Sequence, residues 1–143
     1  MIDVNDISSD GDAFILNTGS PHYVTIVSDL QNKDVFSDGR AIRRNSKYNA
    51  QGINVNFVED MGDHYYVRTY ERGVENETLA CGTGVTAVAL AMAKKKNQSG
   101  SVKTSLIVPG GNLAVSFNYD GSNFTKVFLE GPATFVFTGT LSI

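Results

Sequence analysis

The chain has 143 residues, a length that suits one domain with a real hydrophobic core. Its apolar content of 41% is ordinary for a globular protein, and its net charge of −3 gives no basic footprint for nucleic acid or an anionic membrane. A single cysteine excludes an intrachain disulfide, and nothing resembles a zinc-ligand cluster, so we expect a reducing compartment and no metal. No signal peptide is recognisable, and the apolar run 85–93 is far shorter than the roughly 20 residues that span a bilayer, so we expect a cytoplasmic protein.

The first third of the chain predicts short strands and one surface helix. Runs rich in β-formers at 13–16 and 23–27 flank a turn at Thr18-Gly19-Ser20-Pro21. Residues 32–44 are polar, with apolar residues at roughly helical spacing. This spacing predicts a short helix on the surface.

The middle of the chain predicts a strand pair and then a buried helix. Residues 53–59 and 65–70 are strand-like and are joined through the turn 60–63. Residues 85–95 are apolar on nearly all sides, which predicts a helix that is buried all round. The basic run Lys94-Lys95-Lys96 would complement the dipole at the C-terminal end of that helix.

The last third predicts only strands, at 106–108, 112–119, 126–130 and 134–138, separated by turns that contain glycine or proline. A curved, mixed and mostly antiparallel sheet wrapped around one central buried helix satisfies the whole pattern. The predicted fold class is therefore α+β, with residues 1–143 as a single domain.

The most informative segment surrounds the only cysteine, Cys81. Cys81 precedes Gly82-Thr83-Gly84 at the start of the apolar helix, where free N–H groups and the helix dipole stabilise a thiolate. Such a thiolate could exchange a proton with a substrate whose carboxylate docks on the same N–H groups. Two other interpretations stay open from these residues: an inert buried thiol, and a phosphate cradle that lacks the lysine of a P-loop.

The segment Gly73–Gly84 (GVENETLACGTG), with Glu71-Arg72 before it, resembles the second-cysteine motif of diaminopimelate epimerase. That family inverts one α-carbon of diaminopimelate without pyridoxal phosphate. Its fold has two similar halves, each of which gives one cysteine to a shared cleft, and this chain resembles the C-terminal half only, with the N-terminal half absent. The resemblance covers about residues 13–143 and includes, in order, Asn17–His22, Gly52–Phe57, Val108–Gly111 and Glu130–Ala133.

The resemblance implies roles for the residues around the cysteine. Cys81 would be an acid/base that exchanges the α-proton, and Glu71 would tune or assist its thiol. The backbone of Gly82 and Thr83 would hold the α-carboxylate of the substrate. One residue more than in many family members stands at Glu75-Asn76, which could alter the geometry between Glu71 and Cys81.

Further roles are implied at a distance from the cysteine. Arg72 and Asn54 would bind the distal carboxylate, because a guanidinium fork suits a carboxylate. Ser20 stands where the family often has an asparagine ligand, and its hydroxyl reaches less far. His22 would lie beside the cysteine of the other half and tune it. His64 has no recognisable partner and is predicted to be a surface residue.

The implied activity is the interconversion of LL- and meso-diaminopimelate in lysine and peptidoglycan-precursor biosynthesis, with no cofactor. Inversion needs a base on one face and an acid on the other, so we expect the chain alone to be inactive. Its partner would be the missing N-terminal half or a second copy in a homodimer. The alternatives are a relative of proline racemase or of the phenazine-biosynthesis isomerase, and a non-catalytic binding or assembly domain. The Glu-Arg-Gly and Glu-Thr-x-x-Cys pattern favours the diaminopimelate enzyme.

Overall fold

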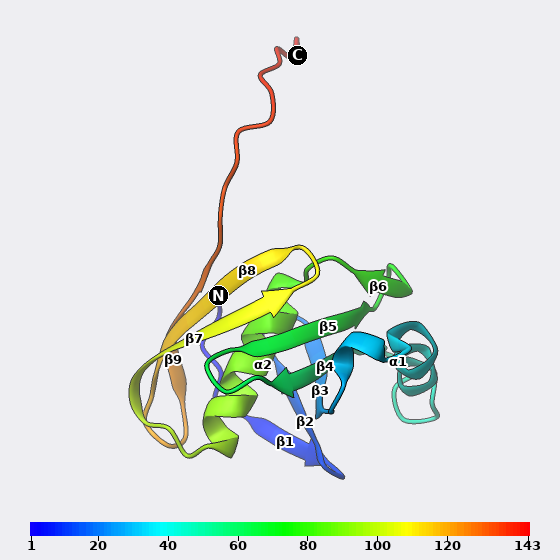
Figure 1. Ribbon diagram of the computed structural model, residues 1–143, viewed down its shortest axis with the longest axis vertical. Helices are drawn as coiled ribbons and strands as arrows, with labels where there is room; N and C mark the ends of the chain where they lie inside the picture. Colours follow the sequence, from blue (N-terminus) through cyan, green and yellow to red (C-terminus); the bar gives the residue numbers. More distant parts are fainter.

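One open mixed sheet forms the body of the protein (Figure 1). The computed structural model describes every residue from Met1 to Ile143. The strand order is β1-β2-β3-β4-β5-β7-β8-β9, with β6 paired to β5. The pairs β3–β4 and β5–β7 are parallel and the others are antiparallel. The strands are β1 (Ile7–Asp10), β2 (Ala13–Asn17), β3 (Pro21–Ile26), β4 (Asn54–Asp60), β5 (Tyr65–Glu71), β6 (Asn76–Thr78), β7 (Gly100–Val108), β8 (Gly111–Tyr119) and β9 (Phe124–Glu130).

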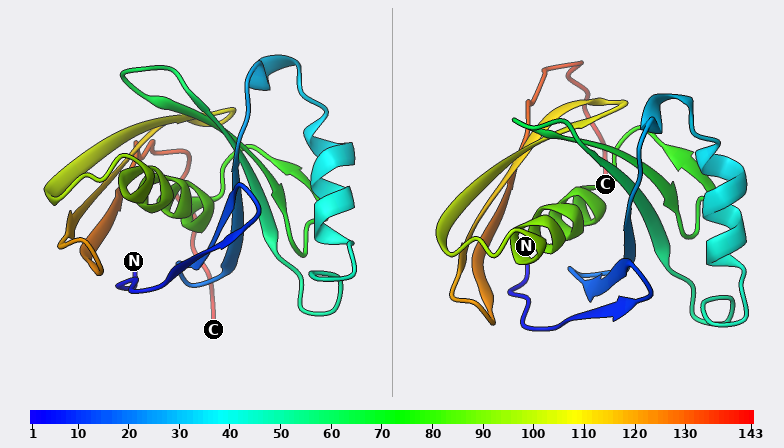
Figure 2. Two further views of the ribbon diagram at one scale, coloured as in Figure 1. Left: turned by 90° about the horizontal axis from the view of Figure 1, so that it is seen from below. Right: turned by 60° about the horizontal axis from the view of Figure 1, so that its bottom comes forward.

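The sheet curves around helix α2 (Gly82–Lys95), which lies at the centre of the molecule (Figure 2). Every residue from Gly84 to Ala93 is buried, and α2 packs against strands on both sides of the sheet's curve. The predicted α+β class, with one central buried helix inside a curved mixed sheet, is confirmed.

Helix α1 (Val35–Arg43) lies on the outer face of β4 and β5, opposite α2 (Figure 2). Asp34 caps it by accepting a hydrogen bond from the N–H of Ser37 at 3.0 Å. A 3₁₀ turn, η1 (Leu30–Asn32), precedes it, so the predicted helix at 32–44 begins later than expected. The second core under α1 consists of Leu30, Val35, Tyr48, Ile53, Val55, Phe57 and Tyr70.

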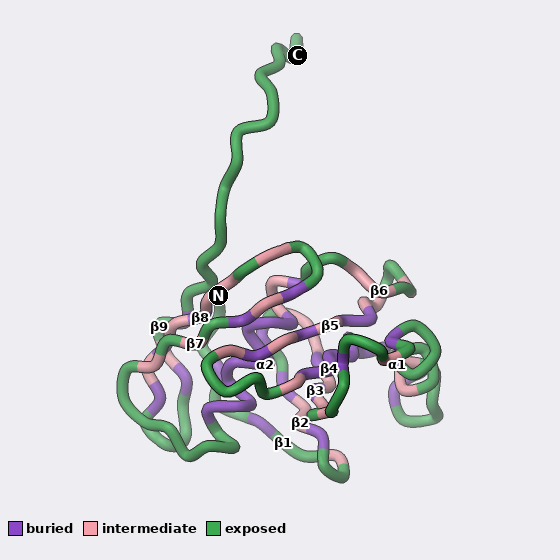
Figure 3. Tube along the Cα trace, in the orientation of Figure 1, coloured by how far each residue is buried: buried purple, intermediate pink, exposed green.

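The residues after β9 are the main error in the predicted strands. Residues 131–143, here called the C-terminal tail, form no strand and extend away from the sheet (Figures 1 and 3). Their apolar side chains are open to solvent, with Phe135 80% and Phe137 79% exposed. The apolar run Phe135-Val136-Phe137 suits a strand, but a strand needs a neighbour, and the tail pairs with none in this chain.

Two short strands, β1 and β6, were not predicted because both are polar. Each lies at a margin of the sheet, where polar residues meet water and the hydrophobic pattern is weak. No helix of the protein is long and apolar enough to cross a membrane.

Candidate active site

Cys81 is the residue at which the chain passes from extended structure into α2. Its own backbone is extended (φ −128°, ψ 105°), and its carbonyl accepts the first helical hydrogen bond from the N–H of Val85 at 2.9 Å. The preceding loop is anchored by the N–H of Gly110, which donates to the carbonyl of Leu79 at 2.7 Å. The predicted position of the cysteine, at the helix start, is therefore what the structure has.

The Cys81 side chain is mostly buried, with 8% of the residue exposed. Its sulfur lies 3.6 Å from the hydroxyl of Thr83. Hydrogen bonds from Thr83 and from the N–H of Gly84 favour the thiolate, but they are outweighed. Burial, first, and the charge of Glu71 raise the pKa of the Cys81 thiol above its ordinary value.

This balance corrects one expectation from the sequence. The helix start was expected to favour the thiolate, yet in this chain desolvation is the larger effect. The sequence indicates that the cysteine begins a helix, but it does not show how deeply the folded chain buries the thiol.

Glu71 ends β5 and lies beside the β6 strand that leads to Cys81. Its carboxylate accepts a hydrogen bond from the hydroxyl of Thr78 at 2.9 Å. The turn between β5 and β6 spans Glu71–Glu75. It is closed by a hydrogen bond from the N–H of Glu75 to the carbonyl of Glu71 at 2.8 Å. Glu75 has a left-handed backbone (φ 57°). The extra residue at Glu75-Asn76 therefore sits at the end of the turn, and the pairing of Glu71 with Asn76 stays regular.

Ser20, Asn54 and Arg72 form one hydrogen-bonded cluster. The Asn54 amide donates to the Ser20 hydroxyl at 2.8 Å, and its oxygen accepts from the backbone N–H of Arg72 at 2.8 Å. The Arg72 guanidinium reaches the same hydroxyl at 3.4 Å and the carbonyl of Gln51 at 3.1 Å. The parallel pairing of β3 with β4 places residues from distant parts of the sequence together here.

His22 is completely buried on β3. Its Nδ1 lies 3.1 Å from the amide nitrogen of Asn56, and its Nε2 has no hydrogen-bond partner in the chain. Burial, with a smaller contribution from the charge of Arg72, lowers the pKa of His22 to about 4. The ring is therefore neutral at pH 7.

Two residues of this region were not singled out by the sequence. Asn56 is fully buried and bonds to His22, to the carbonyl of Tyr23 and to the hydroxyl of Thr69. Thr18 donates to the carbonyl of Thr83 at 2.8 Å and so ties the loop before β3 to the first turn of α2. The polar alternation in Asn-Val-Asn at the start of β4 was the available signal for Asn56, since a buried strand is expected to be apolar there.

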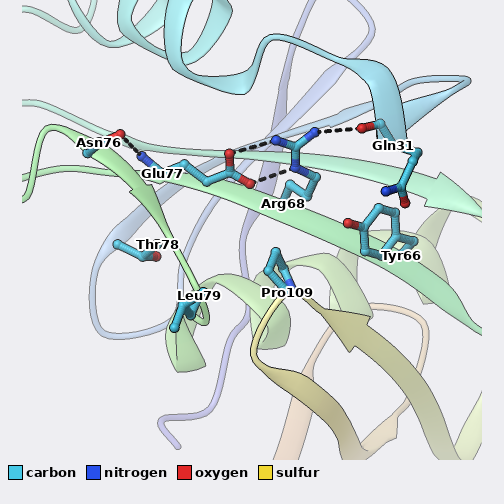
Figure 4. A pocket seen from close by; sticks show the side chains of 8 residues that line it. All are labelled: Gln31, Tyr66, Arg68, Asn76, Glu77, Thr78, Leu79 and Pro109. Carbon is cyan, nitrogen blue, oxygen red and sulfur yellow. Dashed lines mark hydrogen bonds and ion pairs between the residues drawn. The ribbon is translucent and has the colours of Figure 1, made fainter.

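The largest pocket of the chain lies elsewhere (Figure 4). It has a volume of about 520 Å³ and contains the ion pair of Arg68 with Glu77, in which Nε lies 2.6 Å from a carboxylate oxygen. None of the predicted site residues lines it or any other pocket of the chain. Its lining residues are Gln31, Tyr66, Arg68, Asn76, Glu77, Thr78, Leu79 and Pro109.

His64 is the other histidine of the chain. His64, expected to have no partner, lies 2.5 Å from the carboxylate of its neighbour Asp63 at the β4–β5 turn and is partly exposed. No three His, Cys, Asp or Glu side chains are grouped so that they could hold a metal ion.

The architecture defines the class of fold: it is the one seen in part of solved phenazine-biosynthesis and proline-racemase structures. A PhzF-family phenazine biosynthesis protein from Enterococcus faecalis superposes with a TM-score of 0.52 at 16% identity, covering 80% of this chain and 38% of that one. A probable proline racemase from Agrobacterium radiobacter gives a TM-score of 0.52 at 13% identity, covering 85% of this chain and 39% of that one. At such low identity these likenesses show the fold alone.

Sequence relatives identify the family. The family model described as diaminopimelate epimerase matches residues 14–136, and the chain belongs to that family. A diaminopimelate epimerase from Flavobacterium psychrophilum is 46% identical over 99% of this chain and 55% of its own length. Those from Chlorobaculum tepidum and Aquifex aeolicus are 40% and 42% identical over 90% and 95% of this chain, and each is covered over 49% of its length. The chain thus spans about half the length of the curated relatives it matches.

Proposed function

We propose that this chain is the C-terminal domain of a diaminopimelate epimerase, which interconverts LL- and meso-diaminopimelate without a cofactor. The observation that carries the proposal is the arrangement around the start of α2. Cys81 lies at the first helical turn, Glu71 lies close enough for its charge to act on the thiol, and a hydrogen-bonded Ser20–Asn54–Arg72 cluster lies at the neighbouring ends of β3, β4 and β5.

Cys81 would exchange the α-proton of the substrate. The α-proton of an amino acid is a weak acid, so removal of this proton needs stabilisation of the charge that develops on the α-carboxylate. The backbone N–H groups of Gly82 and Thr83, at the start of α2, would be the donors to that carboxylate. The raised pKa of the Cys81 thiol keeps it protonated in the open half, and the approach of a substrate and a second domain would complete the environment that permits ionisation.

Ser20, Asn54 and Arg72 would recognise the distal carboxylate. Arg72 supplies a fork of N–H donors, and its backbone is held by Asn54. Ser20 accepts from both neighbours in this chain, so its own hydroxyl hydrogen is free to donate to a ligand.

The reaction would need a second half. The chain contains one cysteine, whereas inversion of a carbon centre uses an acid and a base on opposite faces. The candidate residues line no closed pocket, and the chain spans about half of its relatives. The other half would supply the second cysteine and the opposite wall of the cleft. A second copy of this chain in a homodimer is the other possible partner.

The test is an epimerase assay on this chain alone, and on this chain mixed with the unmatched N-terminal portion of the Flavobacterium psychrophilum relative. We expect no turnover of LL-diaminopimelate by either piece alone and turnover by the mixture. A mixture made with Cys81→Ala should be inactive. Turnover by this chain alone, in a preparation free of host epimerase, would disprove the need for a second half, and an active Cys81→Ala mixture would disprove the role of Cys81.

A further inference from the structure

The hydrogen bonds of Asn56 determine which nitrogen of His22 carries the proton. Asn56 is fully buried, and each polar atom of its amide has a partner. Its nitrogen donates to the carbonyl of Tyr23 at 3.0 Å and faces Nδ1 of His22 at 3.1 Å. Its oxygen accepts from the hydroxyl of Thr69 at 3.0 Å.

The orientation of this amide is set by Tyr23. A rotated amide would place its oxygen against the Tyr23 carbonyl, and two acceptors would then face each other in a buried site. With the amide nitrogen there instead, its second hydrogen points to Nδ1 of His22, which must accept it. A neutral imidazole has a single hydrogen, so this hydrogen is on Nε2.

The Nε2 group is then a buried donor that has no acceptor in the chain. Buried donors without partners are rare, because each gives up its hydrogen bond to water without a replacement. The ring cannot escape this cost by ionising, since burial lowers its pKa to about 4. The chain therefore keeps a donor ready for an acceptor that it does not itself contain.

Asn56 also lies against the other acid/base position. Its oxygen occupies the space where a side chain on Gly84 would stand, and Gly84 in turn lies against the side chain of Cys81. One buried amide thus contacts both the histidine on β3 and the first turn of α2.

We propose that Asn56 is a positioning residue, which holds His22 in the Nε2–H tautomer so that the ring acts on the incoming half as a hydrogen-bond donor and not as a base. The acceptor of that hydrogen bond would be the second cysteine, and this assignment rests on the proposed function. A donor stabilises a thiolate, whereas an acceptor at the same place would take up its proton. Because the ring is completely buried in this chain, docking of the other half must move the side chains that cover it.

The test reads the tautomer directly, by nitrogen NMR of the full chain labelled at histidine. A His64→Gln variant assigns the signals, because the chain has two histidines. We expect His22 to show an unprotonated Nδ1 and a protonated Nε2 throughout pH 5.5–7.5. A protonated Nδ1, or a mixture of both tautomers, would overturn the proposal.

Asn56→Asp tests whether the Asn56 amide determines the tautomer of His22. The substitution keeps the size of the side chain but replaces the hydrogen-bond donor that faces Nδ1 with an acceptor. We expect Nδ1 of His22 to be protonated in this variant, because it then donates to the new carboxylate. The control is Thr86→Val on α2, which removes the hydrogen bond from the buried Thr86 to the carbonyl of Gly82 and should leave the tautomer of His22 unchanged.

An Asn56→Asp variant that folds and still has the Nε2–H tautomer would disprove the role of Asn56. If that variant does not fold, Asn56→Ser in its place should give a mixture of tautomers, and a single Nε2–H tautomer there would also count against the role. None of these measurements uses turnover, so a failure of the proposed epimerase activity would be seen separately.

Discussion

The amide oxygen of Asn56 lies where the side chain of residue 84 would point, so only glycine fits at the third position of α2. This contact joins β4 to the helix start that carries Cys81. It also explains why the segment after the cysteine contains a glycine with ordinary helical geometry, at a place where alanine would make a better helix.

Gly84→Ala should therefore destabilise the chain. The added methyl group would overlap Asn56 and press on Cys81, and overpacking of this kind costs about 1–3 kcal/mol, which exceeds the gain in helix propensity of up to about 1 kcal/mol. Urea unfolding measures the change. Gly139→Ala is the matched control, because a methyl group there meets only an ordinary contact at 3.7 Å, and it should be neutral. A Gly84→Ala chain as stable as the original would show that the contact is easily relieved.

Most of the fold could be predicted from the pattern of apolar residues. Strands β2 to β5 and β8, and the buried run of α2, have strong apolar signals, and each formed close to its predicted bounds. The tail fails for a reason outside the local pattern, since strand formation depends on a neighbouring strand. Phe135-Val136-Phe137 has the β-forming composition of a strand, but no neighbouring strand pairs with it.

The candidate site was predicted by motif, and its electrostatics were not. The segment Gly73–Gly84 located Cys81, but the raised pKa of its thiol follows first from burial in the folded chain, which no local motif shows. Asn56 was missed for a similar reason. Its role depends on the register that brings β4 beside Tyr23 and beside Thr69 on β5, and no local pattern shows that register.

In this half alone, Cys81 should react with an alkylating agent as a thiol of raised pKa. Burial and the charge of Glu71 both disfavour the thiolate, so the rate should rise at a higher pH than for a free cysteine peptide. Glu71→Gln removes one of these causes and should lower the apparent titration point. Asp12→Asn, which removes an equal charge at an exposed position, should have no effect. A titration point at or below that of the peptide would mean that the hydrogen bonds at the helix start prevail.

His22 should make the stability of the chain depend on pH below about 6.5. The pKa of His22 is lowered to about 4 in the folded chain. As the pH falls, the unfolded chain therefore binds a proton at His22 at a higher pH than the folded chain does. The free energy of unfolding should be constant above about pH 6.5 and fall as the pH drops from there towards 4. The full loss is on the order of 3 kcal/mol, from about 1.4 kcal/mol for each pH unit.

Urea unfolding at pH 7.5, 6.0 and 5.0 follows this loss before most carboxylates titrate. His22→Gln should flatten the slope between pH 6.5 and 5, and His64→Gln, at the other and partly exposed histidine, is the control for the substitution itself. An unchanged slope in His22→Gln would assign the pH dependence to other groups.

Removal of residues 134–143 should leave the stability of the domain almost unchanged. The large apolar side chains of this segment are open to solvent, with Phe137 the least exposed at 79%, so their loss removes no core contact. The cut is placed after Ala133 because Gly131 lies against Leu113, and Pro132 lines a small pocket beside β8.

Thermal unfolding of the shortened chain should match that of the whole chain within a degree or two, with less aggregation, since exposed apolar segments associate. Val127→Ala, in the buried part of β9, is the contrasting control and should cost about 1 kcal/mol or more. A large drop in the unfolding temperature after truncation would show that the tail packs on the domain in solution.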